Sequence, residues 1–291
     1  MSSPISILYD APGPLARRRE RIGSTVAALV VLALLGLAVW YAAGRDVFAL
    51  ERWDVLWDPP RGQTAADVWR SLLVVGLGAT LKAAVVAAPL AFVLGLVLAV
   101  CRTARLAPVR IGATVVIELF RGLPVLLMMF FALLGFGWSA FAAVLFGLTV
   151  YNMAIIAEIV RAGLASLPKG QSEAAYAVGL SRGQTLRLVL LPQALRTMAP
   201  SLVAQLVVLL KDSSLGFIVG YPELLKAITN NGQFFGNTYL VALFAVGAGI
   251  YLVVNITLSR LALRLRGRAR RTAAPAVDLT AAVTPTGGTA A

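Results

Sequence analysis

Histidine is absent from the 291 residues of this chain, and cysteine occurs once, at Cys101. A single cysteine cannot form a disulfide within the chain, and one thiol without histidine leaves few ligands for a zinc or thiol enzyme. Charge is also scarce, because 13% of the residues are Asp, Glu, Lys or Arg while 59% are hydrophobic and the mean hydropathy is +0.84. This composition is too apolar for a soluble globular domain and indicates an integral membrane protein.

The phosphate-binding loop G-x-x-x-x-G-K-[ST] is another absence, since it occurs nowhere in the sequence. We therefore expect the chain to bind no ATP in that manner and no cofactor of its own. The 26 Lys and Arg residues exceed the 13 Asp and Glu residues, which in a soluble protein would suggest nucleic acid. In a membrane protein such an excess belongs on the cytoplasmic side, so we predict lipid as a partner and no nucleic acid.

Six apolar runs are long enough to cross a membrane. They span residues 24–43, 71–100, 111–136, 140–164, 197–220 and 238–263. The run at 24–43 is longer than the apolar core of a signal peptide, so we interpret it as an uncleaved first helix. Lys and Arg are concentrated in every second segment between the runs and in both tails, and basic segments lie on the cytoplasmic side of a membrane. This pattern predicts an all-α polytopic protein with six transmembrane helices and both termini in the cytoplasm.

This topology divides the chain into five parts. They are a cytoplasmic tail at 1–23, an extra first transmembrane helix at 24–43, an exterior loop at 44–70, a five-helix core at 71–263 with a cytoplasmic loop at 165–196, and a basic, disordered cytoplasmic tail at 264–291. Within the core, an exterior turn is predicted at 221–237. The last tail is rich in Ala, Thr, Pro and Gly and has too little bulk to pack.

The cytoplasmic loop contains a polar, small-residue segment at 171–192 that predicts two short helices. Gly179 can adopt the left-handed conformation that ends the first helix. Ser181 and Gln184 have the spacing of a capping box that starts the second, and Pro192 is expected to stop it. The alanines of the first helix leave room for another protein to lie close against it.

The same segment carries a spaced motif: E-A-A, three residues, Gly, nine residues, an aliphatic residue, one residue, then L-P. It is formed by Glu173, Ala174, Ala175, Gly179, Val189, Leu191 and Pro192. This motif resembles the EAA loop of the membrane-spanning subunit of bacterial ABC importers, with Val189 where the family more often has Ile. The stretches 118–131 and 158–225 resemble more narrowly the polar amino-acid permeases, so the resemblance covers roughly residues 70–262.

The resemblance implies a permease subunit in the bacterial cell membrane. Its implied partners are a second permease chain, identical or paralogous, a separate ATPase subunit that uses ATP, and an extracytoplasmic substrate-binding protein. It also implies that the helix at 170–179 lies in a groove on the ATPase, and the coupling candidates are Glu173, Ala174, Ala175 and Gly179. The alternative is an ordinary amphipathic cytoplasmic loop.

Two charged residues and a serine deep in the fifth span are candidates for the translocation path or gate. Lys211, Asp212 and Ser213 lie about 20 Å from the cytoplasmic end of that span, where charges usually face a cavity or a partner. The resembling family has a similar K-D-T/S-S-L segment there. An internally paired structural kink is the alternative.

Four residues of the fourth span are further pathway candidates. Glu158 and Arg161 are three residues apart on one helical face and can pair, either as part of a gate or as a structural salt bridge. Tyr151 and Asn152 are polar near the middle of the span, where groups that bind an α-amino or α-carboxyl group are needed. Glu118 and Arg121 repeat the three-residue spacing.

The function predicted first is that of an importer permease for a polar amino acid, with glutamate as the preferred substrate and glutamine or a basic amino acid as alternatives. An intramembrane enzyme that uses Glu158, Glu118 or Asp212 as acid and base is the competing class, although no metal ligand set or Ser-His pair supports it. An ion channel would not need the coupling loop.

Overall fold

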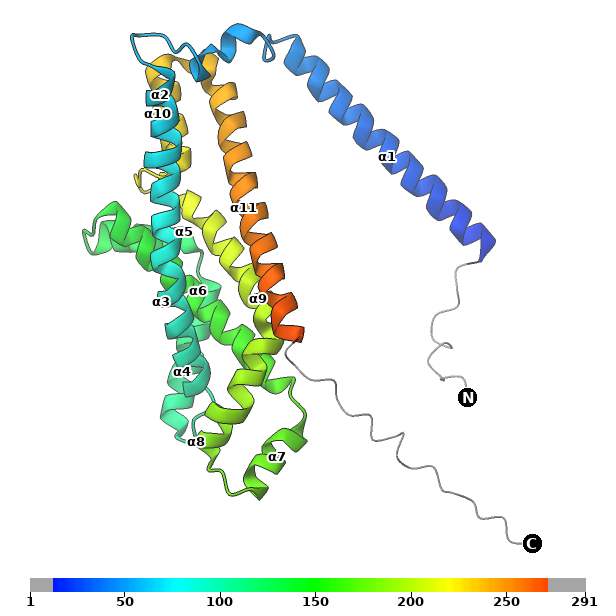
Figure 1. Ribbon diagram of the computed structural model, residues 1–291, viewed down its shortest axis with the longest axis vertical. Helices are drawn as coiled ribbons and strands as arrows, with labels where there is room; N and C mark the ends of the chain where they lie inside the picture. The colour runs from blue at the N-terminus through cyan, green and yellow to red at the C-terminus, as the bar shows by residue number, and fades with distance from the viewer. Residues whose placement is uncertain (1–12, 272–291) are drawn as a thin grey trace.

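The computed structural model describes residues 13–271, and every secondary-structure element in this part of the chain is helical (Figure 1). Within these residues, five helical runs are long and apolar enough to cross a membrane, and a bent pair of helices can supply a sixth. The prediction of an all-α, polytopic membrane protein is confirmed. The α-helices are α1 (Pro14–Ala43), α2 (Ala65–Trp69), α3 (Gly78–Cys101), α4 (Ala107–Gly122), α5 (Val125–Phe130), α6 (Ala140–Ala165), α7 (Lys169–Ala177), α8 (Arg182–Gln184), α9 (Leu191–Asp212), α10 (Leu224–Phe235) and α11 (Leu240–Arg271).

Short 3-10 and π segments join or extend these helices. The 3-10 segments are η2 (Leu50–Arg52), η3 (Asp54–Leu56), η7 (Ser213–Phe217) and η8 (Asn237–Tyr239). The π segments are η4 (Arg70–Leu77), η5 (Phe131–Gly135) and η6 (Thr185–Leu190).

The first helix, α1, begins at Pro14, well before the predicted start at residue 24. Proline suits the first turn of a helix because the N–H group that it lacks would have no partner there. None of the residues in the most apolar stretch of α1 is buried, and Figure 1 shows α1 leading away from the other helices. The predictions made for residues 1–12 and 272–291 lie outside the described residues.

The bundle is organised around α6, which contacts α3, α4, α5 and α9. On α3, a buried residue with a small side chain recurs at every fourth position, and this spacing places the set on one helical face. Small side chains let two helix backbones approach closely, and Gly95 of α3 faces Ile156 of α6. The set on α3 comprises Ala83, Ala87, Ala91, Gly95 and Ala99.

The predicted third span at 111–136 is not one helix. It is a pair, α4 and the run from α5 to η5, bent by 101°. Leu123 between them is extended, with φ −92° and ψ 137°. The ring of Pro124 disfavours the helical conformation for the preceding residue, so the break follows from the sequence.

The predicted stop at Pro192 is wrong, because a single helical run extends from Arg182 to Phe217 through α8, η6, α9 and η7. Pro192 is the second residue of α9 and directly follows the π segment η6. A π turn disrupts the regular hydrogen-bond pattern, so the missing N–H group of proline costs little there. The run therefore starts well before the predicted fifth span at 197.

The predicted exterior turn at 221–237 is a helix, α10, packed against η4 and α11. Its buried residues Leu224, Ala227 and Ile228 have the spacing of one helical face. Figure 1 places α10 and α7 at opposite ends of the bundle. One end therefore carries a packed helix where a loop is predicted.

Candidate functional site

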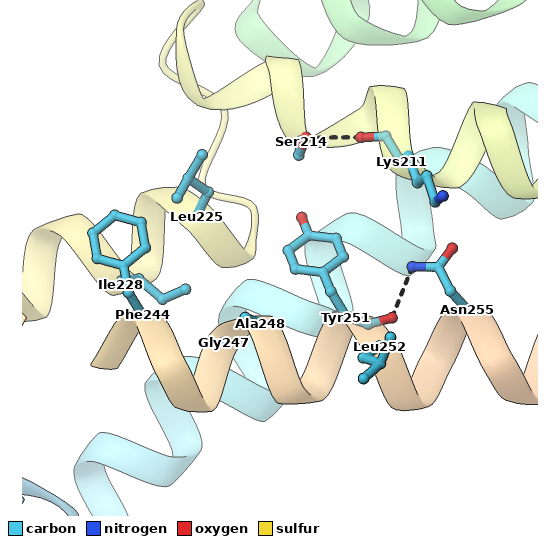
Figure 2. A pocket seen from close by; sticks show the side chains of 10 residues that line it. All are labelled: Lys211, Ser214, Leu225, Ile228, Phe244, Gly247, Ala248, Tyr251, Leu252 and Asn255. Atoms are coloured by element: carbon cyan, nitrogen blue, oxygen red, sulfur yellow. Dashed lines mark hydrogen bonds between the residues drawn. The ribbon is translucent and has the colours of Figure 1, made fainter. Parts of the chain in front are cut away.

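A cavity of about 470 Å³ lies between the run α9–η7, α10 and α11. Its lining is mainly apolar, with four polar side chains: Lys211, Ser214, Tyr251 and Asn255. Figure 2 shows Lys211 and Ser214 approaching from one side, and Tyr251 and Asn255 approaching from α11 on the other. An apolar cavity with a few convergent polar groups is the usual form of a small-molecule site.

Two polar groups of this cavity are without partners in the described part of the chain. Lys211 forms no ion pair there. Asn255 donates from Nδ2 to the carbonyl oxygen of Tyr251 at 2.7 Å, but its Oδ1 is buried and accepts no hydrogen bond. A cation and a free acceptor on facing helices are what an amino acid needs for its α-carboxylate and its α-ammonium group.

The other two polar groups of the cavity are already engaged. Ser214 donates from Oγ to the carbonyl oxygen of Lys211 at 2.7 Å. The hydroxyl group of Tyr251 donates to Oε2 of Glu223 at 2.8 Å. These bonds hold the cavity wall and leave two groups without protein partners in the described part of the chain: the exposed ammonium group of Lys211 and the buried Oδ1 of Asn255.

The two other candidates next to Lys211 do not line this cavity. Ser213 is fully buried, and its hydroxyl group donates to the carbonyl oxygen of Leu210 at 2.7 Å. Asp212 is the last residue of α9 and is partly exposed. Of the three predicted residues, the structure brings only Lys211 to the cavity.

The two polar candidates in the middle of α6 lie elsewhere. Asn152 is fully buried; it donates to the carbonyl oxygen of Leu148 at 2.7 Å and accepts from Nε2 of Gln205 at 2.8 Å. Both ends of its amide are therefore satisfied, and the pair joins α6 to α9. Tyr151 is partly exposed and packs against the hydrophobic core around Met129 and Leu148.

Glu158 and Arg161 form the ion pair that their spacing predicts, with Arg161 Nη2 at 2.6 Å from Glu158 Oε1. Arg102, at the end of α3, also contacts Glu158, at 2.9 Å, and lies 3.6 Å from Glu118. Glu118 in turn pairs with Arg121 at 2.7 Å. Arg102 therefore joins two local pairs into one network across the ends of α3, α4 and α6.

The predicted coupling residues lie on α7 and the turn that follows it. Glu173 and Ala174 are exposed, whereas Ala175 is 5% exposed and faces the protein. Gly179 has φ +84°, a left-handed conformation that side chains disfavour, and it ends α7 as predicted. The N–H groups of Gly179 and Leu180 donate to the carbonyl groups of Tyr176 and Ala175, at 2.9 and 3.1 Å, which is a Schellman motif.

The predicted second helix of this segment starts as expected. Ser181 and Gln184 form a reciprocal capping box, with the N–H group of Ser181 donating to Oε1 of Gln184 at 2.8 Å. Gln171 of α7 accepts from Gln193 of α9 at 3.2 Å. Through this hydrogen bond, α7 is attached to the long helical run that ends at the cavity.

Glu223 is a charged residue whose burial the sequence does not indicate. It is 0% exposed, and its carboxylate accepts from the N–H groups of Leu225 and Lys226, both at 2.9 Å, as well as from Tyr251. Burial raises the pKa of Glu223, against the lowering effect of these three donors. Glu223 thus caps α10 and fastens it to α11 beside the cavity.

Asn255, Tyr251 and Arg102 are the other residues that sequence reasoning missed. Asn255 is a polar residue within the apolar run 238–263, and this signal alone could have identified it. Nothing local marks Tyr251 or Arg102, because their partners lie 28 and 56 residues away along the chain.

A family model described as "Binding-protein-dependent transport system inner membrane component" matches residues 91–271. The chain belongs to this family. The match covers α4 to α11 and thus includes the residues of the cavity, the ion-pair network and α7.

Among curated members of this transport family, the glutamate transport system permease protein GluD of Corynebacterium glutamicum is 44% identical over 219 residues, 71% of this chain and 80% of GluD. The probable glutamine ABC transporter permease protein GlnP of Bacillus subtilis is 38% identical over 209 residues, 70% of this chain and 94% of GlnP. A solved amino acid ABC transporter with histidines matches with a TM-score of 0.64 and 28% identity, over 70% of this chain and 97% of the other.

These relatives establish this family member as an amino-acid ABC transporter permease with several membrane-spanning helices. The resemblance seen in the EAA motif is confirmed. The chain is a transporter subunit, and the alternative of an intramembrane enzyme is not supported, since the relatives are named as transport permeases.

Proposed function

We propose that this permease imports a polar amino acid, with glutamate as the first candidate, and that the substrate is held in the cavity lined by Lys211 and Asn255. The observation that carries the proposal is the pairing of an unmatched ammonium group with an unpartnered amide oxygen in one apolar cavity. The relatives named for glutamate and glutamine support the same class of substrate.

The cavity fits the part that all α-amino acids share. Lys211 binds the α-carboxylate as an ion pair, with a charge-assisted hydrogen bond from its ammonium group. Oδ1 of Asn255, which is buried here, accepts from the α-ammonium group once the side chain turns towards the cavity. These two groups leave the substrate side chain unspecified, so glutamine or a basic amino acid remains an alternative cargo.

We propose further that an ATPase subunit binds the exposed face of α7 and uses ATP, while an extracytoplasmic protein delivers the substrate at the end that carries α10. Exposed Glu173 and Ala174 are offered to the ATPase, and the turn at Gly179 fixes the helix that carries them. A second permease chain, identical or paralogous, completes the pathway in the bacterial cell membrane. Both termini lie in the cytoplasm.

Four of the remaining pathway candidates, Glu158, Arg161, Asp212 and Ser213, keep a gating role in this proposal. Glu158 and Arg161 belong to a network that joins the ends of three helices, so a change in one helix is resisted by the other two. Asp212 and Ser213 stand at the junction of α9 and η7, where the helix tightens beside the cavity. Tyr151 and Asn152 support the centre of α6.

The test is uptake of labelled glutamate, glutamine and arginine into cells that lack this chain, with the native chain or a variant restored. We expect the native chain to restore uptake of one acidic or amide substrate. Lys211→Met should reduce this uptake more than tenfold, because the charge that pairs with the substrate carboxylate is removed. Lys226→Met is the matched control, since it removes the same charge from α10 outside the cavity lining.

Three results would contradict parts of the proposal. Equal uptake by Lys211→Met and by the native chain would exclude the cavity as the substrate site. Full rescue by Glu173→Lys would show that Glu173 has no part in coupling. Restored uptake of arginine alone would move the substrate assignment to basic amino acids.

A further inference from the structure

A second hollow, of about 360 Å³, lies at the ends of α3, α4 and α6 and is lined by three arginines: Arg102, Arg110 and Arg161. The remaining lining residues are Thr114, Ile111 and Val115 of α4. The cavity proposed for the amino acid is lined by α9, α10 and α11, so the two sites share no residue.

The hollow carries an excess of positive charge. Its arginines belong to a cluster in which Arg102, Arg121 and Arg161 pair with the carboxylates of Glu118 and Glu158. Arg110, which also lines the hollow, adds a fourth positive charge, which leaves a net charge of +2. Arg110 forms no ion pair in the described part of the chain, and it makes one long contact, 3.5 Å, with the carbonyl oxygen of Ala104. Arg161 contacts Glu158 through Nε and Nη2, so its Nη1 is left for another anion.

The depth of these arginines matches the headgroup region of a membrane. Arg102 directly follows the last residue of α3, Arg110 is the fourth residue of α4, and Arg161 lies four residues before the end of α6. At 1.5 Å per residue, all three lie within about 6 Å of the ends of their helices. Guanidinium groups at this level face lipid phosphates and not the acyl chains.

An apolar face adjoins the arginines on the same helix. Ile111 is 57% exposed and Val115 is 58% exposed, and they are four residues apart on one side of α4. A free anion in water would need the guanidinium groups only. A ligand with a phosphate group beside hydrocarbon chains satisfies the arginines and covers Ile111 and Val115 together.

We propose that this hollow binds the headgroup of an anionic phospholipid, with the phosphate between Arg110 and Arg161 and the acyl chains against Ile111 and Val115. Because Arg102 and Arg161 also hold Glu158, the bound lipid braces the network that joins α3, α4 and α6. Phosphatidylglycerol represents the ligand class in the test below.

The experiment measures binding of single lipids to the purified full-length chain in detergent by native mass spectrometry. We expect phosphatidylglycerol to bind more tightly than phosphatidylcholine, which has no net charge. Arg110→Gln should weaken phosphatidylglycerol binding about fivefold and leave phosphatidylcholine binding unchanged, because one guanidinium group near the surface is lost. Arg110→Lys should keep most of the affinity, since the charge is retained.

Arg187→Gln is the matched control, because Arg187 is an exposed arginine that does not line the hollow. It should bind phosphatidylglycerol as the native chain does. Val115→Glu adds a carboxylate to the same lining without removing an arginine, and it should also weaken binding. This second variant keeps the test decisive if Arg110→Gln unfolds.

Four outcomes would overturn the proposal. Arg110→Gln and Val115→Glu could both retain native affinity, or Arg187→Gln could lose as much affinity as Arg110→Gln. Displacement of phosphatidylglycerol by inorganic phosphate would assign the hollow to a free anion. Displacement by excess glutamate would assign it to the transported substrate.

Discussion

At the scale of single residues, two asparagines in the membrane-spanning helices have opposite surroundings. Asn152 has partners at both ends of its amide, whereas Asn255 has an amide oxygen that is buried without a partner and lines the cavity. A polar group that is satisfied within the bundle stabilises the bundle. A polar group left unsatisfied beside a cavity is available for a ligand.

Replacement of Asn152 should therefore reduce stability. In Asn152→Leu, the amide of Gln205 loses its acceptor in the interior, so we expect a loss of about 1 kcal/mol in the free energy of unfolding. Thermal unfolding of the purified protein in detergent measures this loss. An unchanged unfolding temperature would show that water or another group replaces Asn152 as the partner of Gln205.

Replacement of Asn255 should instead reduce transport. Asn255→Leu removes an acceptor that has no partner within residues 13–271, together with one hydrogen bond to the carbonyl group of Tyr251 in the same helix. Because that carbonyl group lies inside α11, the unfolding temperature should stay close to that of the native chain. Uptake of the transported amino acid should fall about tenfold, because a hydrogen bond to a charged group is worth about 1.5 kcal/mol or more. Normal uptake with a lowered unfolding temperature would identify Asn255 as a structural residue like Asn152.

At the scale of elements, the end of α7 depends on a backbone conformation that glycine alone adopts readily. Gly179 has φ +84°, so Gly179→Ala should destabilise the turn by about 1–2 kcal/mol and weaken copurification with the ATPase. Gly170→Ala is the control on the same helix, because a Cβ at Gly170 meets nothing within 4 Å and its φ is not positive. Equal copurification of the two variants with the ATPase would show that ATPase binding does not depend on the conformation of this turn.

The attachment of α10 should depend on pH through Glu223. Burial raises the pKa of Glu223 in the folded protein above its unfolded value of 4.5, so the folded state binds a proton more tightly than the unfolded state does. The stabilisation from this proton is therefore full below pH 4.5 and is lost as the pH rises through the folded pKa. The native chain should lose stability relative to Glu223→Gln over that interval.

The measurement is the difference in unfolding temperature between the native chain and Glu223→Gln across this pH range, which cancels the effects of other acids. A difference that shifts in favour of the native chain as the pH rises would contradict the expectation. It would mean that the two backbone N–H groups and Tyr251 stabilise the carboxylate more than burial destabilises it.

The elements that the sequence predicted well are those that local spacing determines. Gly179 ends α7, Ser181 and Gln184 cap the next helix, and Glu158 pairs with Arg161, because each of these relations lies within four residues. The apolar runs likewise located most of the membrane helices, because hydropathy alone determines them.

The sequence predictions were wrong where the backbone departs from the regular geometry that a local rule assumes. Pro192 does not stop a helix, because a π turn precedes it, and the break at Leu123 and Pro124 was overlooked within an apolar run. Arg102 and Glu223 could not be placed, since contacts with distant helices decide their positions. The cavity was missed for the same reason, apart from Lys211.

At the scale of the whole molecule, the proposed orientation places α7 in the cytoplasm and the loop before α2 outside. The single cysteine makes this testable, because Cys101→Ser gives a background without cysteine. A membrane-impermeant maleimide should then label Asp58→Cys in intact cells, and Lys169→Cys only after permeabilisation. Both positions are exposed. The reverse pattern would invert the topology and place α7 out of reach of ATP.

The unbroken run from Arg182 to Phe217 has a mechanical consequence. One end adjoins α7, and Lys211 near the other end lines the cavity, so the run can act as a lever. Pro200 lies inside α9, and from there to Lys211 the helix rises about 16 Å, so a tilt of this part by roughly 15° moves Lys211 by about 4 Å. A displacement of this size exceeds the length of an ion pair, so a small rotation imposed at α7 is enough to take Lys211 away from a bound carboxylate.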